Sequence, residues 1–306
     1  MRDEGLNSIR LARRAMACEF EIVIVDGRDR DALVDIGNLA LEEIQRLDGD
    51  LSCFAPTSEV SFVNAEAGKR PIAVGPDLFE ILSAAKQVWR DTDGAFDITA
   101  GPLIDLWRAA EQTGTPPDER AIKDALGAVG MAHVLLDEET HSVRYDVNGL
   151  RINLGAVGKG YAVDKAASIL REYDVQSALV SGGGSTVFAF GEGPDGEGWR
   201  VGIRHPSMVD ERVAEIVLRD QAMSTSGGPA QRDKNVREAF EHIIDPLTGL
   251  TAESEAASVT VISDDAMLSD ALATAFYLRG KALAEAYCRR YPTISTIFVS
   301  IDGRVY

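Results

Sequence analysis

Lys159 is enclosed by three glycines in the segment 153–165, which reads Asn-Leu-Gly-Ala-Val-Gly-Lys-Gly-Tyr-Ala-Val-Asp-Lys. Glycines let the backbone approach a ligand closely, the start of a helix offers unpaired N–H groups, and a lysine adds positive charge. Together these features indicate an anion site that suits a phosphate or a diphosphate. The segment is not a Walker A loop, because Asn153 and Gly160 replace the first glycine and the Ser or Thr of that pattern. The alternative is a glycine-rich turn with a solvated lysine, and the segment alone favours that alternative.

Asp270 and Thr274 lie four residues apart in an otherwise apolar segment, so they share one face of the helix expected there. A carboxylate on such a buried helix must be paired, hydrogen-bonded or bound to a metal. A carboxylate with a hydroxyl or a carbonyl is the oxygen donor set that Mg²⁺ takes when a phosphorylated ligand completes its shell. A purely structural role for Asp270, as a cap or facing water, is equally compatible with this helix.

Residues 242–249, His-Ile-Ile-Asp-Pro-Leu-Thr-Gly, combine an imidazole, a carboxylate and a turn. His242 is one of four histidines in the chain, and it is the candidate for acid–base chemistry near neutral pH. A histidine that is hydrogen-bonded for structure is the alternative.

Three more segments could either bind a ligand or have a purely structural role. The glycine-rich segments 181–185 and 225–228 could cradle a phosphate or a ring edge, or could bend a sheet. Residues 93–107 mix aromatic and small residues with Asp97 and Thr99, so they could wall a flat heteroaromatic ligand or form a buried crossover. The spacing supports neither a Ser-His-Asp nor a Cys-His triad.

The helices and strands that must position these residues follow one another along the chain without a regular alternation. Hydrophobic periodicity predicts helices over 31–47, 58–64, 76–89, 120–129, 159–172, 265–279 and 281–290. It predicts strands over 19–25, 133–136, 142–146, 150–154, 178–181, 186–190, 199–204, 213–218, 257–262 and 295–301. Several strands are joined as meanders, which favours an α+β fold over a doubly wound parallel sheet. We expect residues 1–15 to be an N-terminal tail and residues 16–306 to form a single domain.

The composition limits the possible partners. The formal net charge of −18 argues against non-specific binding to nucleic acid or to an anionic membrane surface, and a phosphorylated ligand would need a lysine or a divalent cation. Three widely spaced cysteines make no disulfide framework. The sequence contains no run of 18 or more apolar residues, so it predicts no membrane span, and no apolar signal segment precedes Ala15. We therefore expect a cytoplasmic protein.

The segments above, in this order, resemble the ApbE family of FAD:protein FMN transferases, formerly labelled thiamine-biosynthesis lipoproteins. The matching motifs are Met16-Ala17, Leu51-Ser52, Ser58-Glu59, Asn64, Gly94-Ala-Phe-Asp-Ile-Thr, Gly101-Pro-Leu, Leu154 to Asp164, Gly182-Gly183, Ser224-Thr-Ser-Gly227, His242-Ile-Ile-Asp-Pro, Thr248-Gly249 and Asp270-Ala-Leu-Ala-Thr-Ala275. They run from about Met16 to Val305, and their shared order is far more specific than any one motif.

The resemblance implies a compact α+β fold, with mixed or antiparallel sheets packed with helices, that binds FAD together with Mg²⁺ or Mn²⁺. Enzymes of the family attach FMN through a phosphoester to a threonine or serine of a target flavoprotein and release AMP. Carried over, the metal ligands are the Ala156 carbonyl, Asp270 and Thr274, and Lys159 meets the phosphates. The remaining candidates for binding the flavin nucleotide are Met16, Ser52, Phe96, Asp97, Thr99, Gly182, Gly183, Gly184, Ser226 and His242. Our hypothesis is that His242 is the base for the acceptor hydroxyl, so that His242, Asp270 and Lys159 form the catalytic set.

The sequence departs from the family pattern in places. Ala17-Cys18 stands where the family usually has Gly-Thr, Gly184-Ser185 follows where Asp or Asn is common, and 229–233 replaces a tyrosine-rich run. Two alternatives therefore stay open: a Mg²⁺-dependent pyrophosphatase that splits FAD into FMN and AMP, and an FAD-binding protein without turnover. The retained Lys159, Asp270 and Thr274 favour catalysis. The sequence names neither the acceptor protein nor the oligomeric state, monomer or dimer.

Overall fold

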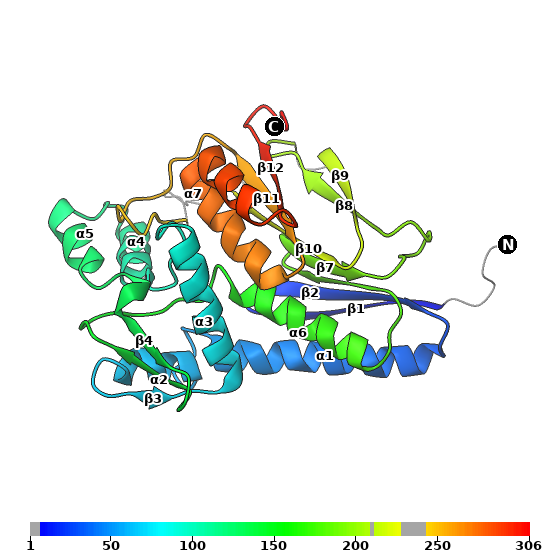
Figure 1. Cartoon of the computed structure of the whole chain (residues 1–306), viewed down its shortest axis with the longest axis horizontal. Coiled ribbons are helices and arrows are strands. Elements are labelled where there is room, and N and C mark those ends of the chain that lie inside the picture. Colours follow the sequence, from blue (N-terminus) through cyan, green and yellow to red (C-terminus); the bar gives the residue numbers. More distant parts are fainter. Residues whose placement is uncertain (1–6, 209–210, 228–242) are drawn as a thin grey trace.

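A computed structural model of the chain describes residues 7–208, 211–227 and 243–306 (Figure 1). The strands are β1 (Asn7–Ala15), β2 (Cys18–Asp26), β3 (Ile72–Ala73), β4 (Val134–Asp137), β5 (Ser142–Tyr145), β6 (Ala178–Gly182), β7 (Thr186–Phe190), β8 (Trp199–Arg204), β9 (Arg212–Leu218), β10 (Gln221–Gly227), β11 (Ser258–Ser263) and β12 (Ser295–Val299). The helices are α1 (Arg30–Leu51), α2 (Glu59–Glu66), α3 (Pro76–Asp91), α4 (Gly101–Thr113), α5 (Glu119–Leu126), the 3₁₀ turn Met131–His133, α6 (Gly158–Glu172) and α7 (Ala266–Arg290). The α+β class is confirmed.

A seven-stranded sheet in the order β1-β2-β6-β7-β10-β11-β12 forms the centre of the molecule, and each neighbouring pair is antiparallel. Strand β2 shows how the sequence builds its two faces. Phe20, Ile22 and Ile24 belong to the main core, whereas Val23 and Val25 belong to a second cluster on the opposite face. This alternation is expected for a strand covered on both sides.

Helices α1, α6 and α7 pack on the main-core face, and the β8–β9 hairpin covers the other face (Figure 1). The hairpin is held there mainly by Trp199, Ile203 and Leu218, which are buried against the sheet. The three-stranded sheet β3-β5-β4 lies with α2 and α3 at one end of the molecule (Figure 1). Among the described residues, no helix is both long and apolar enough to cross a membrane.

The contact between α6 and α7 is close because Gly160 has no side chain. A Cβ at that position would lie 2.4 Å from the Ala266 carbonyl oxygen. Beside it, Asp164 of α6 accepts hydrogen bonds of 2.8 Å from the backbone N–H groups of Ala266 and Met267, which begin α7. A carboxylate at a helix N-terminus is favourable because the first N–H groups lack helical partners. Asp164 and Gly160 therefore fix the start of α7 against α6.

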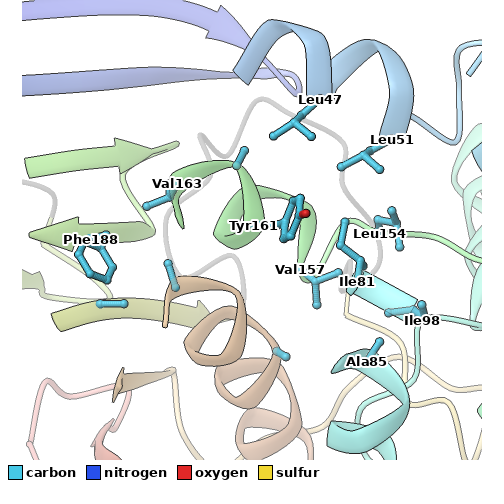
Figure 2. Packing of buried hydrophobic residues seen from close by; sticks show 14 of the residues in the cluster. Leu47, Leu51, Ile81, Ala85, Ile98, Leu154, Val157, Tyr161, Val163 and Phe188 are labelled. Atoms are coloured by element: carbon cyan, nitrogen blue, oxygen red, sulfur yellow. The ribbon is translucent and has the colours of Figure 1, made fainter. Parts of the chain in front are cut away.

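The far side of α6 packs against α1 and α3. Figure 2 shows side chains from these three helices converging, among them Tyr161, Leu51 and Ile81. The Tyr161 hydroxyl is within 2.7 Å of Asp77 and 2.8 Å of Glu80, so its polar end is also satisfied. Packing on both sides holds α6, and with it Lys159, in one position.

Several expected elements differ from the structure. Residues 7–15, predicted as part of a tail, form strand β1, and the helix α4 begins within the segment 93–107, for which no helix was expected. Residues 150–154 are not a strand: Asn64 pairs with the backbone of Ile152, and the Asn153 N–H donates to the Ile98 carbonyl. Their alternating pattern reflects burial in the core without a neighbouring strand. Strand β10 was not predicted, because Gln-Ala-Met-Ser-Thr-Ser-Gly is small and polar.

Candidate functional site

A cavity of about 870 Å³ is walled by segments that are distant in the sequence. Its wall includes the start of α6, the β6–β7 turn, the end of β8, strand β10, the middle of α7 and parts of the segment 95–108. Residues that represent these walls are Phe96, Arg108, Ala156, Lys159, Gly183, Gly184, Arg204, Ser226, Asp270 and Thr274.

Asp270 is the buried charge of this cavity. It lies on α7, is only 4% exposed, and has the Nζ of Lys159 at 3.4 Å from its Oδ2. The Gly160 N–H also donates to Oδ2, at 3.3 Å. Burial raises the pKa of the Asp270 carboxyl, and the positive charge of Lys159 opposes that shift. Since close charge-assisted hydrogen bonds measure about 2.7–2.9 Å, these two long contacts leave the carboxylate with unused acceptor capacity.

Thr274 places a hydroxyl one helical turn beyond Asp270. Its Oγ1 lies 3.1 Å from the Ser226 Oγ of β10 and 3.4 Å from the Asp270 carbonyl oxygen. Ala156 lies on the same cavity wall. The three predicted metal ligands and Lys159 thus line one cavity. The described part of the chain contains no cluster of three or more His, Cys, Asp and Glu residues suited to a metal. The predicted donor set here is one carboxylate, one hydroxyl and one backbone carbonyl.

Gly183 and Gly184 are the two central residues of the tight turn from β6 to β7. Both have positive φ, 62° and 67°, a conformation that glycine adopts without strain, and they lie in a three-residue connection, since Gly182 pairs with Thr186. Both line the cavity, and a Cβ on Gly183 would lie 3.9 Å from Cδ of Lys159. Gly182 is not on the wall; a Cβ there would lie 2.8 Å from the ring of Phe20. Its role in the structure is to make room for that ring.

Phe96 and Asp97 line the cavity, but the Asp97 carboxylate is occupied by local bonds. It accepts from the backbone N–H of Thr99 at 2.8 Å and from that of Met131 at 3.1 Å. Burial raises the pKa of the Asp97 carboxyl, and these donors oppose the shift. The Thr99 hydroxyl donates to Asp97 and accepts from the Gly130 N–H, so Thr99 lies behind the wall.

Two other predicted residues lie behind the wall as well. The Ser52 hydroxyl accepts from the N–H groups of Phe54 and Ala55, both at 3.2 Å, and so shapes the turn that presents Phe54 to the cavity. Met16 is in the β1–β2 turn with a φ of 48° and packs against the main core. His242 lies outside the described residues, although its neighbours Ile243 and Ile244 line the cavity.

The cavity also contains three basic residues, Arg108, Arg204 and His205, that their types and spacing in the sequence do not single out. The guanidinium of Arg108 stacks on the Phe54 ring at 4.5 Å, and Arg204 and His205 extend from the end of β8. Periodicity predicted a strand over 199–204 but carried no information about which residues at its end face a ligand. Arg204 and His205 reach the site only because the β8–β9 hairpin lies over the sheet.

A sequence model of the ApbE family matches residues 16–298. The chain belongs to the ApbE family. A FAD:protein FMN transferase of Klebsiella pneumoniae (strain 342) is 31% identical to it over 258 residues, which cover 84% of this chain and 79% of that protein.

Solved ApbE structures share the fold. The ApbE protein of Thermotoga maritima superposes with a TM-score of 0.85 at 28% identity, covering 98% of this chain and 96% of that one. The apo form of the flavinyl transferase ApbE of Pseudomonas stutzeri gives a TM-score of 0.85 at 27% identity, covering 100% and 95%. The expected family resemblance and fold are therefore confirmed.

Proposed function

We propose that this ApbE-family protein is an FAD:protein FMN transferase, which moves FMN from FAD to a threonine or serine hydroxyl of a target flavoprotein and releases AMP. The observation that carries the proposal is the placement of Lys159, Asp270 and Thr274 on the wall of one cavity. The cavity volume, about 870 Å³, lies within the range of about 300–1,000 Å³ typical of ligand sites. The curated relatives carry the same activity in their names.

The reaction makes one P–O bond and breaks another. The acceptor hydroxyl oxygen bonds to the FMN-side phosphorus, the bond from that phosphorus to the bridging oxygen breaks, and AMP leaves with the bridging oxygen. The hydroxyl proton passes to a base, for which we retain His242 because Ile243 and Ile244, which follow it, line the cavity. Lys159, whose side chain is 23% exposed, would bind phosphate oxygens through its ammonium group. In such transfers the protein mainly positions the groups and stabilises charge.

We propose Mg²⁺ as the metal, with Mn²⁺ as the second choice, held by Asp270, Thr274 and the Ala156 carbonyl. The donor set fits, since these are hard oxygen donors and the contacts of the Asp270 carboxylate with Lys159 and Gly160 are both long. When bound, a divalent ion neutralises negative charge that develops on the diphosphate. Phosphate oxygens of FAD would complete its coordination.

The other cavity residues would position the dinucleotide. Phe96 offers an aromatic surface, and the Gly183–Gly184 turn lets a flat ring or a phosphate approach the backbone. Met16, Ser52, Thr99 and Gly182 lie behind the wall, so we assign them indirect roles in shaping it. Ser226 would orient the Thr274 hydroxyl, with which it is paired at 3.1 Å.

Separating the flavins after reaction tests this proposal. The protein is incubated with FAD, Mg²⁺ and a candidate flavoprotein acceptor, and the acceptor is then denatured and assayed for bound flavin fluorescence. Transfer predicts covalent fluorescence and an equal amount of AMP, both lost when a chelator removes the metal. Free FMN with an unlabelled acceptor would indicate a pyrophosphatase instead, and intact FAD would indicate a binding protein without turnover.

We also propose that the protein works in a reducing compartment such as the cytoplasm. Cys18, Cys53 and Cys288 are free thiols in the structure, which supports this assignment. Burial raises the pKa of each of these thiols, so none has the lowered pKa of a reactive cysteine.

A further inference from the structure

The positive charge available to a dinucleotide in this cavity is smaller than the number of cations suggests. Lys159 already faces the carboxylate of Asp270 at 3.4 Å, so much of its charge is balanced within the protein. Arg108 lies over the ring of Phe54. Arg204 is an exposed arginine on the cavity wall, and its guanidinium forms no ion pair or hydrogen bond with another residue in the described ranges 7–208, 211–227 and 243–306.

The position of Arg204 relative to the glycine turn makes this charge relevant. Its Nη2 lies 3.4 Å from the point that a Cβ on Gly184 would occupy, while Lys159 lies against the preceding glycine, Gly183. The side chains of two basic residues from different elements thus lie beside consecutive residues of one turn. The pairing of β8 with β9 shifts register between Ile203 and Arg204, and such an irregularity redirects the side chains that follow it.

We propose that Arg204 is a binding residue for the diphosphate of FAD, acting beside Lys159 on the glycine turn. The inference rests on the proposed function and adds a residue to it. A guanidinium presents a planar set of donors that matches phosphate oxygens in pairs. In a chain with a net charge of −18, a dianionic ligand is repelled at long range, so a cation that has no carboxylate partner among the described residues has a large effect on affinity.

The test measures FAD affinity by fluorescence titration in the presence of Mg²⁺, at low and at high salt. For Arg204→Gln we expect the Kd of the variant to be about tenfold higher at low salt, and we expect this difference to shrink at high salt because exposed charges are screened. Arg204→Lys should recover part of the affinity. The matched control is Arg200→Gln, which removes the same charge from the same strand, where Arg200 pairs with Glu197 and Glu215 away from the cavity wall.

Three results would overturn the inference: unchanged affinity of Arg204→Gln, a loss equal at low and high salt, or an equal loss in Arg200→Gln. Thermal unfolding of each variant shows whether a loss of FAD affinity is caused by misfolding. If Arg204→Gln is misfolded, the FAD affinity of Arg204→Lys, which keeps the charge and most of the volume, tests the inference instead. If the unaltered protein bound no FAD, the proposed function itself would fail. If the unaltered protein bound FAD and transferred FMN, and Arg204→Gln bound FAD with the same affinity, only the proposed role of Arg204 would fail.

Discussion

At the scale of single residues, the proposed site depends on one buried carboxylate. Asp270 is buried, and its pKa is raised because burial disfavours the charged form. A group whose folded pKa is raised lowers the stability of the folded state as the pH rises above its ordinary value. At neutral pH the charged form of Asp270 is therefore a cost to folding, which a bound cation would offset.

This account predicts opposite effects of Asp270→Asn on stability and on turnover. Because asparagine keeps the shape and an acceptor for the Gly160 N–H, we expect the free energy of unfolding at pH 7 to stay equal or to rise by about 1 kcal/mol. Mg²⁺-dependent turnover of FAD should fall at least about a hundredfold. Denaturant unfolding and AMP release measure the two effects.

The neighbouring residue supplies the control. Ser269 lies on the same helix and bonds to Ser224 at 2.8 Å, away from the cavity wall. Ser269→Ala should lower stability by about 1 kcal/mol with turnover retained. A clear loss of stability in Asp270→Asn with ordinary turnover would instead make Asp270 a structural residue.

At the scale of elements, the distance between α6 and α7 sets the site, because Lys159 comes from the first and Asp270 from the second. Gly160 permits that distance. The requirement for a glycine at this position comes from α7, a helix that begins about a hundred residues later in the sequence. The glycine pattern by itself therefore indicates an anion-binding loop, whereas in the structure Gly160 allows α6 to pack closely on α7.

Gly160→Ala tests this packing. An added Cβ would lie 2.4 Å from the Ala266 carbonyl oxygen and 2.6 Å from the Met267 Cα, both backbone atoms, so the helices must separate. We expect a loss of about 1–3 kcal/mol in the free energy of unfolding and a large loss of turnover.

Gly158→Ala is the matched control on the same helix. Its new Cβ would be 3.8 Å from the Leu154 Cβ, an ordinary contact, so stability should stay the same or rise by about 1 kcal/mol at most. Equal behaviour of the two variants would show that α6 and α7 do not depend on this close approach.

At the scale of the whole molecule, the cavity exists only because distant segments meet across one antiparallel sheet. Motif residues such as Lys159, Asp270 and Thr274 could be selected from the sequence, because their types and spacing imply chemistry. Arg204 could not, since its approach to the site depends on how the β8–β9 hairpin covers the sheet. Strand β10 was missed for a similar reason: small polar residues form a central strand only because their neighbours in the sheet require one.

Asp26 joins distant parts of that sheet and predicts how the fold responds to acid. Asp26 is 3% exposed, and its carboxylate pairs with Arg28 at 2.8 Å and accepts from the Gln176 N–H at 3.0 Å. These bonds tie the end of β2 to the segment just before β6. The bonds to Arg28, above all, lower the pKa of Asp26 to about 2. A lowered pKa gives stability that is present above the ordinary value and is lost as the pH falls towards 2.

We therefore expect Asp26→Asn to lower the free energy of unfolding by about 2 kcal/mol at pH 7, and this difference from the unaltered protein should fall to about half near pH 3. Denaturant titrations at several pH values measure it. Asp50→Asn, which breaks an exposed pair with Arg46, is the control and should show almost no effect. A difference independent of pH would contradict the assignment.

The central claim is that the Lys159–Asp270 site transfers FMN to protein. It is tested most directly by the intact mass of a candidate acceptor after incubation with FAD and Mg²⁺. We predict that the acceptor gains one FMN phosphoester with the unaltered protein, and gains nothing with Asp270→Asn or when the acceptor threonine is replaced by valine. Conversion of FAD to free FMN with no change in acceptor mass, or an undiminished gain with Asp270→Asn, would contradict the claim.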